Sequence, residues 1–326
     1  MPKRPYIHTR DGCGSTGEAL RRLENGGSTS ITPTREIIVK YDEGWIESND
    51  GNRLFWRRSS PDVETTAVLL FVHGLAEHSG RYKHVMEHFA GRGYDCWAFD
   101  YRGHGKSPGL RVHINRFDEF LTDLEAVHHL VRENDPGRPL FLIGHSQGGL
   151  ITLRYTLAHP EDLTGTVVSS PFLGVHPDSR PNAFLRLLAK LLSVVAPRVM
   201  LSKPPDTSLL SRDPTVGEAY LADPLTSYTV SARWFTEVMA AHLDTYKRAG
   251  ELKTSTLVMQ SGDDRLADPA ATRAWVDAAP PELVDSFEWE GFYHEMFNET
   301  EKERVFDRME QWLRANDPQS SATMSL

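Results

Sequence analysis

The sequence contains only two cysteines among its 326 residues, Cys13 and Cys96. Two cysteines far apart in the chain cannot supply the disulfide framework on which small secreted domains depend, so we expect reduced thiols and a cytoplasmic protein. No apolar run approaches the ~18 residues that a membrane-spanning helix needs. The first residues are basic, but no apolar segment follows them, so we expect no secretory signal.

Positive charge is also scarce. The chain has 36 Lys and Arg residues against 45 Asp and Glu residues, which gives a formal net charge of −9. Because no basic cluster stands out from this acidic balance, we expect no nucleic-acid partner. With 39% apolar and 25% charged residues, the chain has enough apolar surface to bury a core. Its length fits one large α/β unit or two domains.

Short apolar segments typical of buried strands alternate with amphipathic helical segments along most of the chain. The strand-like segments are residues 67–73, 94–100, 139–144, 165–170, 256–262 and 285–291. Three further β-rich stretches, at residues 35–41, 45–48 and 53–59, precede them, with a predicted hairpin turn at residues 49–52 between the last two. This order predicts an α/β fold with a mostly parallel sheet covered by helices on both faces.

The alternation breaks down between Pro171 and Tyr228, where prolines accumulate. We interpret residues 172–228 as a helical cap inserted into the α/β unit. The other predicted parts are a core of residues 34–171 and 229–316, a disordered tail at 1–33 that is rich in Gly, Ser and Thr, and a second tail at 317–326.

The predicted cap contains an unusually apolar helix at residues 183–196. Arg186, Lys190 and Ser193 form one narrow polar stripe, which leaves a very wide apolar arc. We expect such a helix to roof an acyl tunnel, to touch membranes or micelles, or to bury itself in a dimer. A cytoplasmic protein with peripheral membrane contact through the cap is compatible with this pattern, and the oligomeric state stays open.

The most informative motif is Gly144-His145-Ser146-Gln147-Gly148, which matches G-x-S-x-G. It follows an expected strand and precedes an expected helix, which is the context that this motif requires. The serine then occupies a tight turn and presents its hydroxyl at the carboxyl end of the sheet, above a helix N-terminus that favours negative charge. Ser146 is therefore the predicted nucleophile.

A nucleophilic serine needs a base, and the base needs a carboxylate that orients it. In this architecture both follow the serine in the chain, the carboxylate first. His294 follows the strand at 285–291 and is the predicted base. Asp263, Asp264 and Asp268 follow the strand at 256–262; Asp268 precedes a proline and has the features of a helix cap. Asp263 and Asp264 both remain candidates on this reasoning.

An oxyanion hole requires two backbone N–H donors near the nucleophile. One is expected from Gln147, the residue after Ser146. The other is expected from Leu75, in the loop His73-Gly74-Leu75 that follows the strand at 67–73.

These motifs together resemble the α/β-hydrolase superfamily, in particular its monoacylglycerol lipase and lysophospholipase branch, which is related to the serine aminopeptidases. The matching segments are HGLAEHSGRY (73–82), FDYRGHGKSPG (99–109), GHSQGG (144–149), SSPFL (169–173) and GDDRLAD (262–268). In the last segment the family's aspartate precedes a pair such as Arg-Leu, which points to Asp264. The resemblance implies an α/β-hydrolase fold and a serine esterase that needs no metal or organic cofactor.

The resemblance also implies residues of a substrate pocket. Glu77 and Arg81 would lie at its polar end, where glycerol hydroxyls sit in the family; the alternative is an ion pair that braces the oxyanion loop. Phe297 stands where some relatives have a histidine, and together with Trp234 and Phe292 it suggests an aromatic pocket.

One departure from the family concerns Gln147, which replaces a common methionine. Because the expected contact is its backbone N–H, we expect little effect from this replacement.

The sequence thus predicts a carboxylic-ester hydrolase that acts on monoacylglycerol-like or other medium- or long-chain monoesters through an acyl-enzyme. The alternatives are a short-chain carboxylesterase or lysophospholipase of the same fold and, outside enzymes, a ligand-binding protein on a hydrolase fold. The expected partner is a small ester or lipid. No metal site is predicted: His84 and His88 match the zinc pattern H-x-x-E-H, but the helix periodicity turns both toward solvent.

Overall fold

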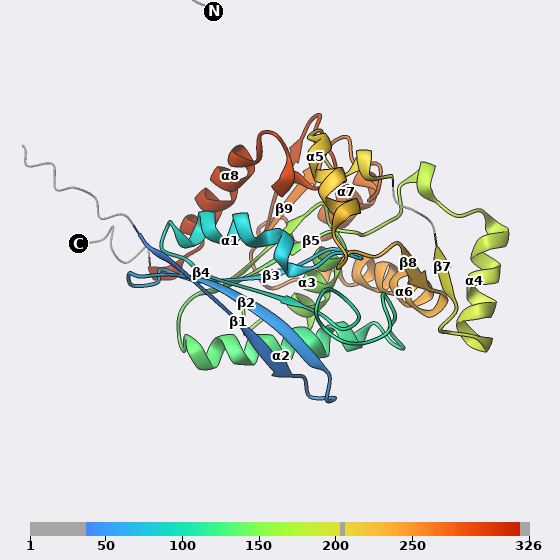
Figure 1. Cartoon of the computed structure of the whole chain (residues 1–326). Helices are drawn as coiled ribbons and strands as arrows, with labels where there is room; N and C mark the ends of the chain where they lie inside the picture. Colours follow the sequence, from blue (N-terminus) through green and yellow to red (C-terminus); the bar gives the residue numbers. More distant parts are fainter. Residues whose placement is uncertain (1–36, 203–205, 320–326) are drawn as a thin grey trace, which may run out of the picture. The chain divides into compact units, whose positions relative to one another are not determined.

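An eight-stranded sheet organises the computed structural model, which describes residues 37–202 and 206–319 (Figure 1). The strands are β1 (Val39–Glu47), β2 (Arg53–Pro61), β3 (Val68–Val72), β4 (Asp95–Asp100), β5 (Leu140–His145), β6 (Gly165–Ser169), β9 (Thr256–Ser261) and β10 (Val284–Trp289). Their order in the sheet is β1-β2-β4-β3-β5-β6-β9-β10. The tail predicted at residues 1–33 and residues 320–326 of the second predicted tail lie outside the described residues.

Only the first two strands depart from the parallel arrangement. β1 pairs with β2, and β2 with β4, in antiparallel register, whereas all other neighbours in the sheet are parallel. The hairpin turn predicted at residues 49–52 is present, and Gly51 occupies its left-handed position at φ 84°. The α/β fold with a mostly parallel sheet is confirmed.

Helices cover both faces of the sheet because the central strands are apolar on both sides. On β3, Val68, Leu70 and Val72 belong to one buried cluster, whereas Leu69 and Phe71 belong to the other. The first cluster includes side chains of α2 (Asp118–Asn134), α3 (Gln147–Ala158), α6 (Ala232–Lys247) and α7 (Pro269–Ala278). The second includes side chains of α1 (Lys83–Ala90) and α8 (Lys302–Ala315), which lie together in Figure 1.

Between β6 and β9 the chain leaves the main sheet. It forms α4 (Ala183–Val195), β7 (Met200–Ser202), α5 (Pro214–Ala222) and β8 (Thr229–Ser231) before α6 returns to the core. β7 and β8 pair with each other in a separate two-stranded sheet. The cap boundaries at residues 172 and 228 stay a prediction.

The helix α4 turns its small side chains inward and its large ones outward. Ala189 and Ser193 are its buried residues, and the Ser193 hydroxyl lies 2.6 Å from that of Thr236 on α6. Phe184 and Val194, in contrast, are 70% and 74% exposed. The apolar arc predicted from the sequence therefore has no cover among the described residues. No helix of the described chain is long and apolar enough to span a membrane.

Candidate active site

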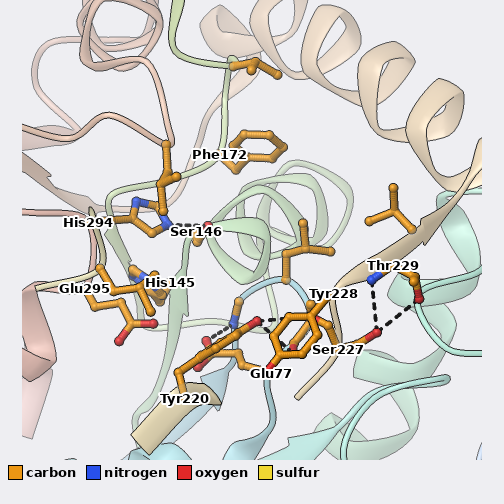
Figure 2. Close-up of a pocket in the computed structure, with 17 residues that line it drawn as sticks. Glu77, His145, Ser146, Phe172, Tyr220, Ser227, Tyr228, Thr229, His294 and Glu295 are labelled. Atoms are coloured by element: carbon orange, nitrogen blue, oxygen red, sulfur yellow. Dashed lines mark hydrogen bonds between the residues drawn. The ribbon is translucent and has the colours of Figure 1, made fainter. Parts of the chain in front are cut away.

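Three polar side chains meet where β5, β9 and β10 end. The imidazole Nε2 of His294 lies 2.8 Å from the Ser146 hydroxyl (Figure 2). Its Nδ1 lies 2.7 Å from a carboxylate oxygen of Asp264. The other Asp264 oxygen accepts hydrogen bonds from the N–H groups of Leu266 (2.8 Å) and Ala267 (3.0 Å). This alignment lets the imidazole take a proton from the serine while the carboxylate fixes its tautomer.

The structure separates the three neighbouring aspartates by environment. Asp264 is buried and reaches His294, whereas the side chain of Asp263 is exposed. Asp268 caps α7 by accepting a hydrogen bond from the Ala270 N–H, as predicted, and its second oxygen pairs with Arg180 at 2.8 Å. Only Asp264 of these three has a geometry that can orient the imidazole.

The backbone at Ser146 is held in a left-handed conformation, with φ 53° and ψ −119°. Such a conformation is costly for a residue other than glycine and persists only where its surroundings enforce it. The Ser146 N–H donates to the Ser169 carbonyl at 3.0 Å. A Cβ atom on Gly148 would collide with the carbonyl oxygens of Val72 and His73, so the turn requires glycine there.

Two backbone N–H groups next to Ser146 have no acceptor among the described residues: those of Leu75 and Gln147. Gln147 is the first residue of α3, whose N-terminus carries partial positive charge, and Leu75 lines the pocket in front of Ser146. Both donors remain available for a negatively charged oxygen on an atom bound to Ser146.

The pocket in front of Ser146 has a volume of about 250 Å³. Its apolar lining includes Leu75, Phe172, Val175, Leu210, Val230 and Leu266. Polar side chains of Glu77, Tyr220 and Glu295 also line it. In Figure 2, Phe172 lies on one side of Ser146, whereas Glu77 and Tyr220 lie on the other. The two sides of the pocket thus differ in polarity: Phe172 gives one side an apolar surface, and Glu77 and Tyr220 give the other side polar groups.

A family model described as "serine aminopeptidase, S33" matches residues 63–301. The chain belongs to this family. The family assignment, together with the sheet and helices described above, confirms the α/β-hydrolase fold that the sequence motifs imply.

Curated relatives of this S33 chain have lipase and phospholipase names. A monoacylglycerol lipase of Mycolicibacterium smegmatis is 34% identical over 264 residues, which is 81% of this chain and 93% of the relative. Phospholipase YtpA of Bacillus subtilis is also 34% identical, over 77% of this chain and 95% of the relative. The crystal structure of Paleococcus ferrophilus monoacylglycerol lipase superposes with a TM-score of 0.71 at 30% identity, covering 86% of this chain and all of that one (100%).

A buried charged network lies beside Ser146 and His294 in this S33 chain. Arg81 lies between two carboxylates, 2.5 Å from Glu77 and 2.6 Å from Glu295. Glu77 also accepts hydrogen bonds from the Gly74 N–H and the Tyr82 hydroxyl. Glu77 lines the pocket, whereas Arg81 lies behind the two carboxylates and does not. The arrangement therefore fits the ion pair that braces the oxyanion loop, while Glu77 still faces the pocket.

Sequence reasoning missed Glu295 and Tyr220. Glu295 directly follows His294, so the sequence places it near His294. Its ion pair with Arg81, however, joins residues that are 214 positions apart. Tyr220 comes from α5, and its hydroxyl donates to the Ala76 carbonyl at 3.1 Å. No local motif marks either contact.

The charges in this network set the protonation of the site. Burial alone would lower the pKa of His294, but the charge and hydrogen bond of Asp264, with Glu295 and Glu77, raise it above its ordinary value. Burial and the neighbouring His294 lower the pKa of His145 to about 4, so His145 is neutral at neutral pH. Burial would raise the pKa of Glu295, but the charge and hydrogen bonds of Arg81 lower it to about 2.

The aromatic pocket predicted from three residues is not formed in this structure. Trp234, Phe292 and Phe297 are all buried, and none of them lines the cavity at Ser146. Phe292 stacks on Trp289, and Phe297 packs against Tyr82. Each of the three side chains fills the interior behind the site, and the pocket is instead lined by the rings of Phe172, Tyr220 and Tyr228.

The expectation for the two histidines of α1 is also wrong. The His84 ring nitrogen lies 2.9 Å from the Phe297 carbonyl, and the His88 ring packs 4.6 Å from that of Phe306. Both histidines thus face α8 and its neighbourhood because that element covers the side of α1 that the helix periodicity left open. Within residues 37–202 and 206–319, no three His, Cys, Asp or Glu side chains are grouped as a metal site would need.

Proposed function

We propose that this protein hydrolyses monoacylglycerol-like carboxylic esters, with Ser146 as nucleophile, His294 as general base and Asp264 as the residue that orients it. The observation that carries the proposal is the continuous hydrogen-bonded series from Ser146 to His294 to Asp264, at 2.8 and 2.7 Å, opening on a largely apolar pocket. The lipase relatives support the same chemistry.

The reaction proceeds in two halves. His294 takes the hydroxyl proton of Ser146 while the Ser146 oxygen attacks the ester carbonyl. The Leu75 and Gln147 N–H groups stabilise the resulting oxyanion. The tetrahedral intermediate expels the alcohol, which receives the proton from His294. A water molecule then gives a proton to His294, attacks the acyl-enzyme and releases the carboxylic acid. Ser146 recovers its proton in that last step.

The pocket favours an ester with one acyl chain and a small neutral alcohol. Phe172, Leu266 and the other apolar side chains can receive an alkyl chain, and each buried CH₂ contributes ~0.8 kcal/mol. Glu77 and Tyr220 can hydrogen bond to hydroxyl groups of the alcohol. Two carboxylates flank a single guanidinium here, so a phosphate diester is disfavoured relative to glycerol. This argues against lysophospholipid as the preferred substrate.

The exposed apolar surface of α4 provides a contact for a lipid surface. Its side chains do not line the pocket, so the acyl-tunnel alternative lacks support from the lining residues. A lipid surface that receives Phe184, Leu187 and Val194 would bury them while holding the enzyme beside its substrate. We therefore favour peripheral membrane or micelle contact through this helix over burial in a dimer.

A substrate panel tests the proposed function. Purified enzyme is assayed with monoacyl-, diacyl- and triacylglycerols, lysophosphatidylcholine and a series of p-nitrophenyl esters, and kcat/KM is compared. We expect medium- or long-chain monoacylglycerols to lead, and two extra chain carbons to raise kcat/KM by about tenfold where they enter the pocket. A strict preference for acetate esters would leave a short-chain carboxylesterase, and no turnover of any ester would leave a binding protein.

A further inference from the structure

A series of buried hydrogen bonds connects α6 to the oxyanion loop. The indole N–H of Trp234 donates to the side-chain oxygen of Gln147 at 2.8 Å. The amide nitrogen of Gln147 donates to the Tyr101 hydroxyl at 3.0 Å, and that hydroxyl donates to the Gly74 carbonyl at 2.6 Å. Trp234, Gln147 and Tyr101 are each at most 4% exposed. We call these four residues the relay.

The donor and acceptor in each hydrogen bond of the relay follow from the indole N–H of Trp234. An indole N–H can only donate, so the Gln147 side chain must turn its oxygen toward Trp234. Its NH₂ group then faces Tyr101 and donates to the phenol oxygen. The phenol proton is left to donate to the Gly74 carbonyl, and burial raises the pKa of Tyr101, so this proton is retained.

The relay ends on the peptide group that carries one of the proposed oxyanion donors. The Gly74 carbonyl and the Leu75 N–H belong to the same planar trans peptide and point in opposite directions. Fixing the carbonyl on Tyr101 therefore fixes the direction of the N–H on the pocket side. His73 lies 2.8 Å from the same carbonyl oxygen, and Glu77 accepts from the Gly74 N–H at 2.6 Å.

We propose that the side chain of Gln147 is a positioning residue for ester hydrolysis. Through Tyr101 it orients and polarises the Gly74–Leu75 peptide, so that the Leu75 N–H meets the oxyanion. The backbone of Gln147 supplies one oxyanion donor, and its side chain sets the other. This proposal differs from the expectation that replacing the common methionine by Gln147 has little effect. The inference rests on the proposed function.

Three single variants separate positioning from packing. Gln147→Met keeps the length of the side chain and removes both of its hydrogen bonds. Tyr101→Phe removes the hydroxyl that holds Gly74, and Trp234→Phe removes the indole donor. Gln260→Met is the matched control, because Gln260 is 3% exposed and donates to the Ser261 carbonyl, outside the oxyanion loop.

Turnover is measured per active site, counted with a fluorophosphonate, so that misfolded enzyme does not enter the rate. For Gln147→Met and Tyr101→Phe we expect kcat to fall by about tenfold with little change in KM, less than the roughly 10²–10³-fold lost with a whole oxyanion donor. The Ki of a trifluoromethyl ketone, which forms an oxyanion on the serine, should rise by the same factor. Trp234→Phe should have a smaller effect in the same direction, and Gln260→Met should change neither quantity.

The double variant Gln147→Met/Tyr101→Phe provides the decisive comparison. If Gln147 acts through Tyr101, the double variant is no slower than Tyr101→Phe alone. Additive losses, or an unchanged kcat and inhibitor Ki in both single variants, would overturn the inference. Ser146→Ala is assayed in parallel: if it remained active, the proposed function itself would fail, whereas an inactive Ser146→Ala beside unaffected Gln147 variants would overturn only the relay.

Discussion

The neighbourhood of Ser146 and the helix α4 reverse the usual rule of burial in opposite ways. Ser146, His294 and Asp264 are polar yet buried, and each is hydrogen bonded to another residue of the chain. Phe184 and Val194 on α4 are apolar yet exposed. The first region is complete within the described chain, which is the condition for preorganised chemistry. The second region, in contrast, has no cover among residues 37–202 and 206–319.

We expect the largest loss of activity when the nucleophile Ser146 is replaced. Ser146→Ala removes the oxygen that forms the acyl-enzyme, so we expect kcat to fall by roughly 10⁴–10⁶-fold. Thermal unfolding should change little, because only one hydroxyl is lost. Activity against a monoacylglycerol and a p-nitrophenyl ester measures the loss. Retention of more than about one percent of the activity would contradict a role for Ser146 as nucleophile.

Substitutions of two neighbouring aspartates, Asp264 and Asp268, should have very different effects on activity. Asp264→Asn removes the charge that orients and stabilises the imidazolium, so kcat should fall on the order of 10⁴-fold. Asp268→Asn is the matched control, because asparagine caps a helix about as well as aspartate. Its kcat and melting temperature should stay close to those of the original chain. A larger loss in Asp263→Asn than in Asp264→Asn would move the assignment by one residue.

The pH dependence tests the charges around the imidazole. His294 acts as a base only when neutral, so activity is lost as the pH falls through its pKa. Because that pKa is raised, the midpoint of the acid limb of kcat/KM should lie above 6.5. Profiles from about pH 5 to about pH 9 with a neutral p-nitrophenyl ester measure it. In Asp264→Asn the midpoint should move to lower pH; a midpoint that stays unchanged would argue against Asp264 as the charge that raises it.

The smallest expected effect concerns α4. Leu187→Asp places a charge on the exposed apolar surface, so binding to phosphatidylcholine vesicles should weaken by about tenfold or more, since a buried leucine is worth ~1.5–3 kcal/mol. Turnover of a short p-nitrophenyl ester in solution should be unaffected. Leu243→Asp on α6 is the control, because Leu243 is 65% exposed against 68% for Leu187.

Equal vesicle binding by both variants would contradict a lipid contact at α4. If sedimentation showed that the original chain is a dimer and Leu187→Asp a monomer, the contact at α4 would be a dimer interface instead.

Features that depend on local sequence could be predicted, whereas features that depend on contacts between distant segments could not. The strands, their order along the chain and the region of Ser146, His294 and Asp264 follow from local apolar patterns and from short motifs next to strand ends. The carboxyl ends of parallel strands lie at one edge of the sheet, so residues that follow β5, β9 and β10 had to come close. Local sequence therefore carried enough information for these positions.

Side-chain directions away from the motifs depend on packing between distant segments. Trp234 and Phe297 were expected in the pocket from the family resemblance, but α6 and the loop after β10 turn them into the interior. His84 and His88 were expected in solvent, but α8 covers that side of α1. The Gln147 side chain hydrogen bonds to Trp234 and Tyr101, which are 87 and 46 residues away in the sequence, so no local motif indicates these contacts.

Ser146 is proposed to form the covalent intermediate, and mapping the residue that a serine-directed reagent labels shows whether it does. The enzyme is inactivated with phenylmethylsulfonyl fluoride, digested and analysed by tandem mass spectrometry. We predict one label per chain, on Ser146, with label and loss of esterase activity rising together. Full inactivation with the label on another residue, or full labelling of Ser146 with the activity intact, would contradict the claim.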